Sequence, residues 1–156
     1  MLMDVVELFD HLEIDAADVV GFSMGAELAL ALAVHYPDRV RSLTIAGSGW
    51  SPREIVDEYR KWFDILAENA ENPDSLRALI EDVPEVIGLP DGAIRTLPMP
   101  LVGIIGELDD ERPYVERICE VRPEFQPIVL PGLDHLGTWQ SPEFPALLER
   151  ALSGGL

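Results

Sequence analysis

The spacing of apolar residues predicts that helices and strands alternate along this chain. Near the N-terminus the apolar positions recur at helical spacing, which predicts an amphipathic helix ending near Glu13. Residues 24–35 are apolar on almost every side and rich in alanine, a pattern typical of a buried helix. Short apolar, β-branched runs predict four strands, the first of them buried, at residues 18–22, 40–49, 101–107 and 125–132. Strands that alternate with helices in this way predict a parallel α/β sheet.

The stretch between the second and the third strand has a different character and divides the chain. It contains two predicted helices, at residues 52–69 and 73–87, and it ends in a segment rich in proline and glycine. We therefore predict a core made of residues 1–49 and 99–156, into which residues 50–98 are inserted as a small helical unit. Two more helices are expected, one after the third strand and one after the fourth, at residues 112–121 and roughly 141–152.

Composition and charge argue against several classes of function. The chain has 29 acidic and 11 basic residues and a formal net charge of −18, which argues against nucleic acid and anionic membranes as partners. Cys119 is the single cysteine and the three histidines are widely separated, so no metal site is expected. No apolar run approaches the ~18 residues of a membrane span, and the N-terminus lacks the basic region of a signal peptide. These features favour a cytoplasmic protein.

A serine lies between two glycines where the first strand meets the buried helix, in the stretch Gly21-Phe22-Ser23-Met24-Gly25. A tight strand–turn–helix bend at this point would lift the Ser23 hydroxyl clear of the sheet, as a nucleophile requires, and both flanking positions must then be small. A helix that begins near Met24 directs its free N–H groups toward the serine. The backbone N–H of Met24 is therefore the natural first donor to an oxyanion.

A serine nucleophile needs a base at neutral pH, and an acid that orients the base. Of the three histidines only His135, on a predicted loop after the fourth strand, follows a plausible acid. The neighbouring Asp134 is expected to be a turn residue. The loop after the third strand offers three acids, and we choose Asp109, with Asp110 as the alternative. Ligands bind at the carboxyl ends of parallel strands, so Ser23, Asp109 and His135 are predicted to meet at one edge of the sheet.

These residues resemble those of the α/β-hydrolase superfamily of serine hydrolases. The stretch "VVGFSMGAELALALAVHYPDRVRSLTIAGS" is similar to the family's nucleophile elbow, buried helix and next strand, "MPLVGIIGELDD" to its acid-bearing strand and "IVLPGLDHLGTW" to its histidine loop. The resemblance implies a partial α/β-hydrolase fold of about four parallel strands. It implies a hydrolase of esters, lactones or related carbonyl compounds that works through an acyl-Ser23 intermediate and without a cofactor. Residues 50–98 would then form the cap that shapes the pocket for a small acyl substrate.

Members of this family have further strands upstream of the elbow, and a loop there provides the second oxyanion donor. This sequence begins at the helix before the elbow, so we expect the C-terminal part of the fold. The strand at residues 18–22 would then lie at an open edge of the sheet, where self-association is possible. The alternative to a working hydrolase is a catalytically weak or inactive remnant that serves as a binding or interaction domain.

Overall fold

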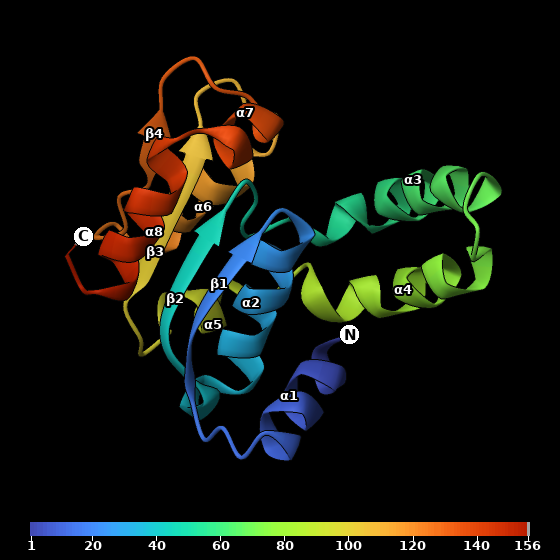
Figure 1. Ribbon diagram of the computed structural model, residues 1–156, viewed down its shortest axis with the longest axis horizontal. Coiled ribbons are helices and arrows are strands. Elements are labelled where there is room, and N and C mark those ends of the chain that lie inside the picture. Colours follow the sequence, from blue (N-terminus) through green and yellow to red (C-terminus); the bar gives the residue numbers. More distant parts are fainter. Residues whose placement is uncertain (156) are drawn as a thin grey trace.

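The centre of the molecule is one sheet of four parallel strands, seen in a computed structural model that describes residues 1–155 (Figure 1). The strands pair in the order β1-β2-β3-β4, and their bounds are β1 (Ala17–Phe22), β2 (Val40–Ala46), β3 (Leu101–Gly106) and β4 (Ile128–Leu130). Each pair of neighbours is parallel, so the carboxyl ends of all four strands lie at the same edge. The predicted architecture, a parallel α/β sheet of about four strands, is confirmed.

Helices connect the strands, as the pattern of apolar residues predicted. Their bounds are α1 (Leu2–His11), α2 (Met24–His35), α3 (Val56–Glu68), α4 (Pro73–Val86), α5 (Asp91–Arg95), α6 (Arg112–Val121), α7 (His135–Gln140) and α8 (Glu143–Leu152), with short 3-10 turns η1 (Pro37–Arg39) and η2 (Arg53–Ile55). Two of these helices, α5 and α7, were not predicted. No helix within residues 1–155 combines the length and the apolar character that a membrane crossing needs.

Three predicted strands are shorter in the structure, and for the second and the fourth the reason is visible in the chain. The fourth strand was expected over residues 125–132, but β4 has only three residues. Pro127 and Pro131 bracket it, and proline has no N–H with which to continue a ladder. The second strand ends at Ala46 because Gly47 adopts a positive φ of 66°, which turns the chain away from the sheet.

Strand β1 lies at the edge of the sheet, which confirms the predicted edge position but corrects the prediction that the strand is buried. It pairs with β2 alone, and its residues alternate between more and less exposed positions. Val20 is 40% exposed. Side chains alternate between the two faces of a strand, so Val20 projects from the face opposite Val19, which packs against the main hydrophobic core.

Helix α2 is buried, as its composition predicted. Seven of its twelve residues are buried, and the helix packs against β1 and β2. One of the seven is a charged residue, Glu27, which is only 1% exposed. The helix ends at His35, just before Pro37, which cannot continue it.

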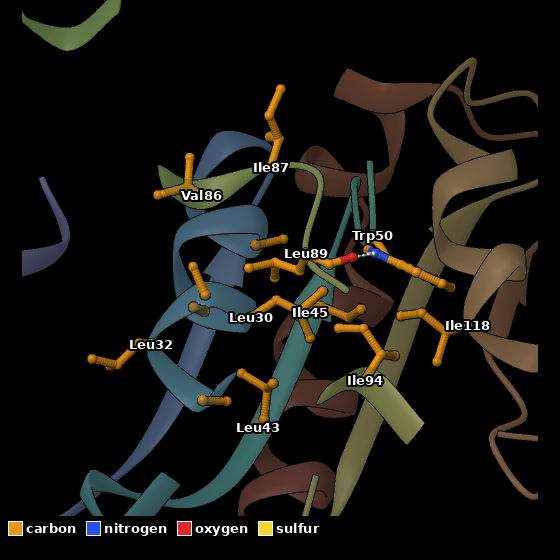
Figure 2. Close-up of a cluster of buried hydrophobic side chains, with 14 of the residues drawn as sticks. Leu30, Leu32, Leu43, Ile45, Trp50, Val86, Ile87, Leu89, Ile94 and Ile118 are labelled. Carbon is orange, nitrogen blue, oxygen red and sulfur yellow. Dashed lines mark hydrogen bonds between the residues drawn. The ribbon is translucent and has the colours of Figure 1, made fainter. Parts of the chain in front are cut away.

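The main hydrophobic core lies between the sheet and the helices α2, α4, α5 and α6. Figure 2 shows Leu43 and Ile45 of β2 facing Leu30 of α2 in this core. The opposite face of the sheet carries a smaller cluster in which Ala46 and Ile104 pack against Phe144 of α8. Alternate residues of each strand therefore face the two layers, as the geometry of a strand requires.

Residues 50–98 contain α3, α4 and α5. Helices α3 and α4 pack against each other and project away from the sheet (Figure 1). The two ends of the segment are part of the core: the Trp50 indole is 1% exposed and its Nε1 donates a hydrogen bond of 2.7 Å to the Leu89 carbonyl (Figure 2). The projecting pair is thus anchored to the sheet through well-packed ends.

Candidate active site

The residue at the centre of the site is Ser23, which has a backbone conformation unusual for a residue with a side chain. Its φ is 56° and its ψ is −128°, and it stands between the last residue of β1 and the first residue of α2. Its N–H donates a hydrogen bond of 2.8 Å to the Ala46 carbonyl at the end of β2, which fixes the bend to the neighbouring strand. Strain of this kind, at about 1–3 kcal/mol, persists only where the surrounding structure enforces it, and it is common at functional sites.

The bend depends on one flanking glycine and not on both, which corrects the prediction that both positions must be small. A Cβ on Gly21 would lie 2.1 Å from the carbonyl oxygen of Gly25. A Cβ on Gly25 would meet no neighbouring atom within 4 Å. Strand and helix therefore touch backbone to backbone at Gly21, while Gly25 faces open space.

The structure brings Ser23, His135 and Asp109 together. The Ser23 Oγ lies 3.0 Å from the Nε2 of His135. On the other side of the ring, Nδ1 lies 3.0 Å from Oδ2 and 3.2 Å from Oδ1 of Asp109. An ionised carboxylate only accepts hydrogen bonds, so Nδ1 carries the proton and Nε2 is left free to accept one from the serine.

Asp109 is placed by its own backbone and by burial. The residue is 5% exposed, and its Oδ1 also accepts the N–H of Glu111 at 3.0 Å. Asp110, the alternative acid, is exposed, and within residues 1–155 it forms no hydrogen bond with the imidazole of His135. Of the two acids that the sequence left open, Asp109 is the one that contacts His135.

His135 begins helix α7, which corrects the prediction that it lies on a loop. Asp134, expected to be a turn residue, is the N-cap of this helix, and its Oδ1 accepts the N–H of Gly137 at 2.7 Å. The cap therefore sets the direction in which the imidazole leaves the backbone. The ring packs against Phe22, with 5.0 Å between the ring centroids, and Phe22 in turn contacts Trp139 of α7.

Met24 is the first residue of α2, so its N–H has no acceptor within the helix. It follows the serine directly, and the partial positive charge of the helix N-terminus lies at the same point. The position is suitable for a donor to an oxyanion that forms at Ser23.

The N-terminal half of the chain matches a known protein family. The model of a family described as alpha/beta hydrolase fold matches residues 1–81, which is more than half of the chain and includes β1, α2 and β2. The chain belongs to the α/β-hydrolase fold family.

Curated proteins with hydrolase activity are among the relatives of this chain. The 2-hydroxymuconate semialdehyde hydrolase of Pseudomonas sp. (strain CF600) is 39% identical over 75 residues, which are 40% of this chain and 26% of that protein. The 3-oxoadipate enol-lactonase 2 of Acinetobacter baylyi is 31% identical over 93 residues, 54% of this chain and 34% of that protein. The matched segments therefore span about a quarter to a third of these curated relatives.

Solved structures show the same fold over nearly the whole chain. A carboxylesterase structure from Nitrososphaera gargenis has a TM-score of 0.80 at 17% identity and covers 99% of this chain and 71% of that one. The meta-cleavage product hydrolase CumD from Pseudomonas fluorescens IP01 has a TM-score of 0.63 at 21% identity, covering 97% and 70%. At these identities the likeness shows the fold.

A buried polar cluster beside the site was not predicted from the sequence. We call it the Glu27 cluster; its members are Glu27, Ser48, Ser51, Tyr59 and Glu111. The Oε1 of Glu27 accepts hydrogen bonds from Ser51, from Tyr59 at 2.9 Å and from Ser48 at 3.4 Å. Because Tyr59 belongs to α3, the cluster joins the helix that follows Ser23 to the projecting pair of helices. The signal available in the sequence was a single acidic residue in an otherwise apolar helix.

The ionisable groups of the Glu27 cluster have raised pKa values. Burial raises the pKa of Glu27 to about 7, and the nearby Glu111 carboxylate acts in the same direction. Burial also raises the pKa of Glu111, with Asp109 adding to the effect and His135 opposing it. The pKa of Tyr59 is raised by burial and by the same two glutamates. The site is therefore flanked by carboxylates whose charges are poorly solvated.

Proposed function

We propose that this protein is a serine hydrolase that acts on an ester, lactone or related carbonyl compound through an acyl-Ser23 intermediate. The observation that carries the proposal is the hydrogen-bonded series from Ser23 Oγ to His135 Nε2 at 3.0 Å, and from His135 Nδ1 to Asp109 at 3.0 Å. Hydrolase relatives within the same family support the reaction class.

In the first step Ser23 Oγ attacks the substrate carbonyl carbon while its proton passes to His135 Nε2. The carbonyl oxygen becomes an oxyanion, to which the N–H of Met24 would donate. Asp109 keeps the imidazole in the required tautomer and stabilises the imidazolium. The protonated His135 then gives its proton to the leaving oxygen, the C–O bond breaks, and an acyl-serine ester is left.

In the second step a water molecule takes the place of the serine. His135 removes a proton from the water as it attacks the acyl carbon, and a second oxyanion forms at the same position. When this intermediate collapses, the proton returns from His135 to Ser23 Oγ. The acid product leaves, and the site regains its starting state.

We further propose that residues 50–98 act as a cap that bounds the substrate pocket. The hydrogen bond from Tyr59 of α3 to Glu27 of α2 supports this role, because it fixes the base of the projecting helices near Ser23. The substrate is then a small acyl compound held between the cap and the carboxyl ends of the strands.

Labelling with a fluorophosphonate tests the function directly, since the reagent reacts with activated serines. We expect one adduct, located on Ser23, and no adduct in Ser23→Ala. Ser153→Ala, which removes an exposed hydroxyl on the far end of α8, is the matched control and should label like the wild type. If the folded wild-type chain takes no label, the alternative of a non-catalytic binding domain is supported instead.

A further inference from the structure

Three carboxylates, those of Asp109, Glu111 and Glu27, are linked by hydrogen bonds that run through Ser48, and we call them the acidic wall. The backbone N–H of Glu111 donates to Asp109 Oδ1 at 3.0 Å, so Glu111 lies directly beside the acid that contacts His135. Its Oε2 is 3.1 Å from Ser48 Oγ, which is in turn 3.4 Å from Oε1 of Glu27. A serine hydroxyl has one proton, so it can donate to only one of these two glutamates at a time.

No basic side chain neutralises this wall. Among residues 1–155, neither Glu27 nor Glu111 takes part in a salt bridge. Arg117 of α6 is engaged with Trp50. Its guanidinium lies 3.7 Å from the centre of the indole ring, and it donates a hydrogen bond to the Trp50 carbonyl. His135, which becomes an imidazolium only during the proposed reaction, opposes the rise in the pKa of Glu111.

Glu27, the most buried of these carboxylates, also has an oxygen that lacks a hydrogen-bond donor within residues 1–155. The Oε2 atom of Glu27 is buried and has no hydrogen-bond partner within the described residues, and the residue is only 1% exposed. An unpaired carboxylate oxygen in poorly solvated surroundings favours a nearby cation or neutral donor and disfavours a further anion.

A substrate acyl group on Ser23 would lie beside His135, which contacts Asp109 at 3.0 Å and interacts electrostatically with Glu111. On the basis of the proposed function, we infer that the site accepts acyl groups that are neutral or positively charged and rejects acyl groups that carry a carboxylate. Charges this close interact strongly at a partly buried site, and one elementary charge is expected to change the acylation rate by about tenfold or more.

Three p-nitrophenyl esters matched in length test the inference. They are the methyl adipate ester, which is neutral, the adipate monoester, which is an anion, and the ω-trimethylammonio hexanoate ester, which is a cation. The rate of acylation of Ser23 is measured from the burst of p-nitrophenol and from the mass of the intact protein at pH 8. We expect the anionic ester to react at least about tenfold more slowly than the neutral one, and the cationic ester to react as fast or faster.

Glu111→Gln should narrow the ratio of the acylation rates of the neutral and the anionic ester. Glu120→Gln, at an exposed position on α6, the helix that Glu111 caps, should leave this ratio unchanged. In the wild type, added salt should also narrow the ratio, because screening weakens the repulsion. Equal acylation rates for the neutral and anionic esters would overturn the inference, and so would a ratio of these rates that responds to neither salt nor Glu111→Gln. In both cases the proposed hydrolase function would stand. If none of the three esters acylates Ser23, the proposed function itself fails, and the inference fails with it.

Discussion

The Nε2 atom of His135 lies 3.0 Å from the Oγ of Ser23 although 112 residues separate them in the chain. The contact exists because both residues follow parallel strands, β4 and β1, whose carboxyl ends lie at the same edge of the sheet. Asp109 joins them from the loop after β3. Rigid strands therefore place three side chains from distant parts of the sequence within hydrogen-bonding distance.

The first prediction separates the two acids after β3. In Asp109→Asn the amide can donate to Nδ1 and so favours the wrong imidazole tautomer, and we expect acylation of Ser23 by p-nitrophenyl acetate to fall on the order of 10³-fold or more. Asp110→Asn removes the same charge from an exposed neighbour and should stay within a few-fold of the wild type. A greater loss in Asp110→Asn than in Asp109→Asn would show that the acid is wrongly assigned.

The second prediction concerns the two glycines that flank the serine. Gly21→Ala would place a methyl group 2.1 Å from the Gly25 carbonyl oxygen, so strand and helix must separate, at a cost of about 1–3 kcal/mol or more in the free energy of unfolding. Gly25→Ala adds a methyl group in open space within a helix, where alanine is favoured over glycine by up to about 1 kcal/mol. Urea unfolding of both variants provides the measurement. A Gly25→Ala variant that is as unstable as Gly21→Ala would contradict the packing described above.

The sequence predicted the parts of this molecule that depend on local patterns. Helix α6 was predicted with its observed bounds, and Ser23, Asp109 and His135 were predicted to meet because strand ends in a parallel sheet share one edge. Helix α7 was missed, since it has only six residues and its one local signal is the cap formed by Asp134. A helix this short has no apolar period to detect.

The Glu27 cluster was missed for a different reason. A lone acidic residue in a buried helix indicates that a polar partner exists, but not which one. The partners of Glu27 come from the loop after β2 and from α3, and Glu111 comes from the start of α6, so only the assembled fold defines them. The open space beside Gly25 could not be predicted either, because it depends on how α2 packs on the sheet.

The third prediction uses the ionisation of Glu27. Its pKa is about 7 in the folded protein and is near 4.5 when the chain is unfolded, so the folded state holds the proton more tightly. This contribution to stability is fully present below pH ~4.5 and is lost as the pH rises through about 7. The raised pKa corresponds to a loss of about 3 kcal/mol between pH 4.5 and pH 8.

Glu27→Gln, which cannot ionise, should flatten this pH dependence and unfold at a higher urea concentration than the wild type at pH 8. Glu7→Gln, an exposed position on α1, should keep the wild-type dependence. Urea midpoints measured at half-unit steps of pH between 5 and 8 make the comparison. If the stabilities of the wild type, Glu27→Gln and Glu7→Gln all change with pH by the same amount, the assignment of the raised pKa to Glu27 is wrong.

The last prediction concerns the open edge of the sheet. Strand β1 pairs only with β2, so the backbone N–H and C=O groups on its other side have no strand partner within the described chain. Its residues include an apolar side chain, Val20, that is 40% exposed, and neither lysine nor proline blunts the strand. An edge of this kind pairs readily with another strand, and the partner that every solution of this protein contains is the β1 edge of a second copy.

We therefore expect the sedimentation coefficient to rise with concentration. Val20→Lys places a charge on the edge and should shift the protein toward monomer, while Ile65→Lys, which alters a 60% exposed side chain on the projecting helix α3, should not. A wild type that sediments as a monomer at every concentration, or an Ile65→Lys variant that dissociates as readily as Val20→Lys, would show that the β1 edge does not mediate association.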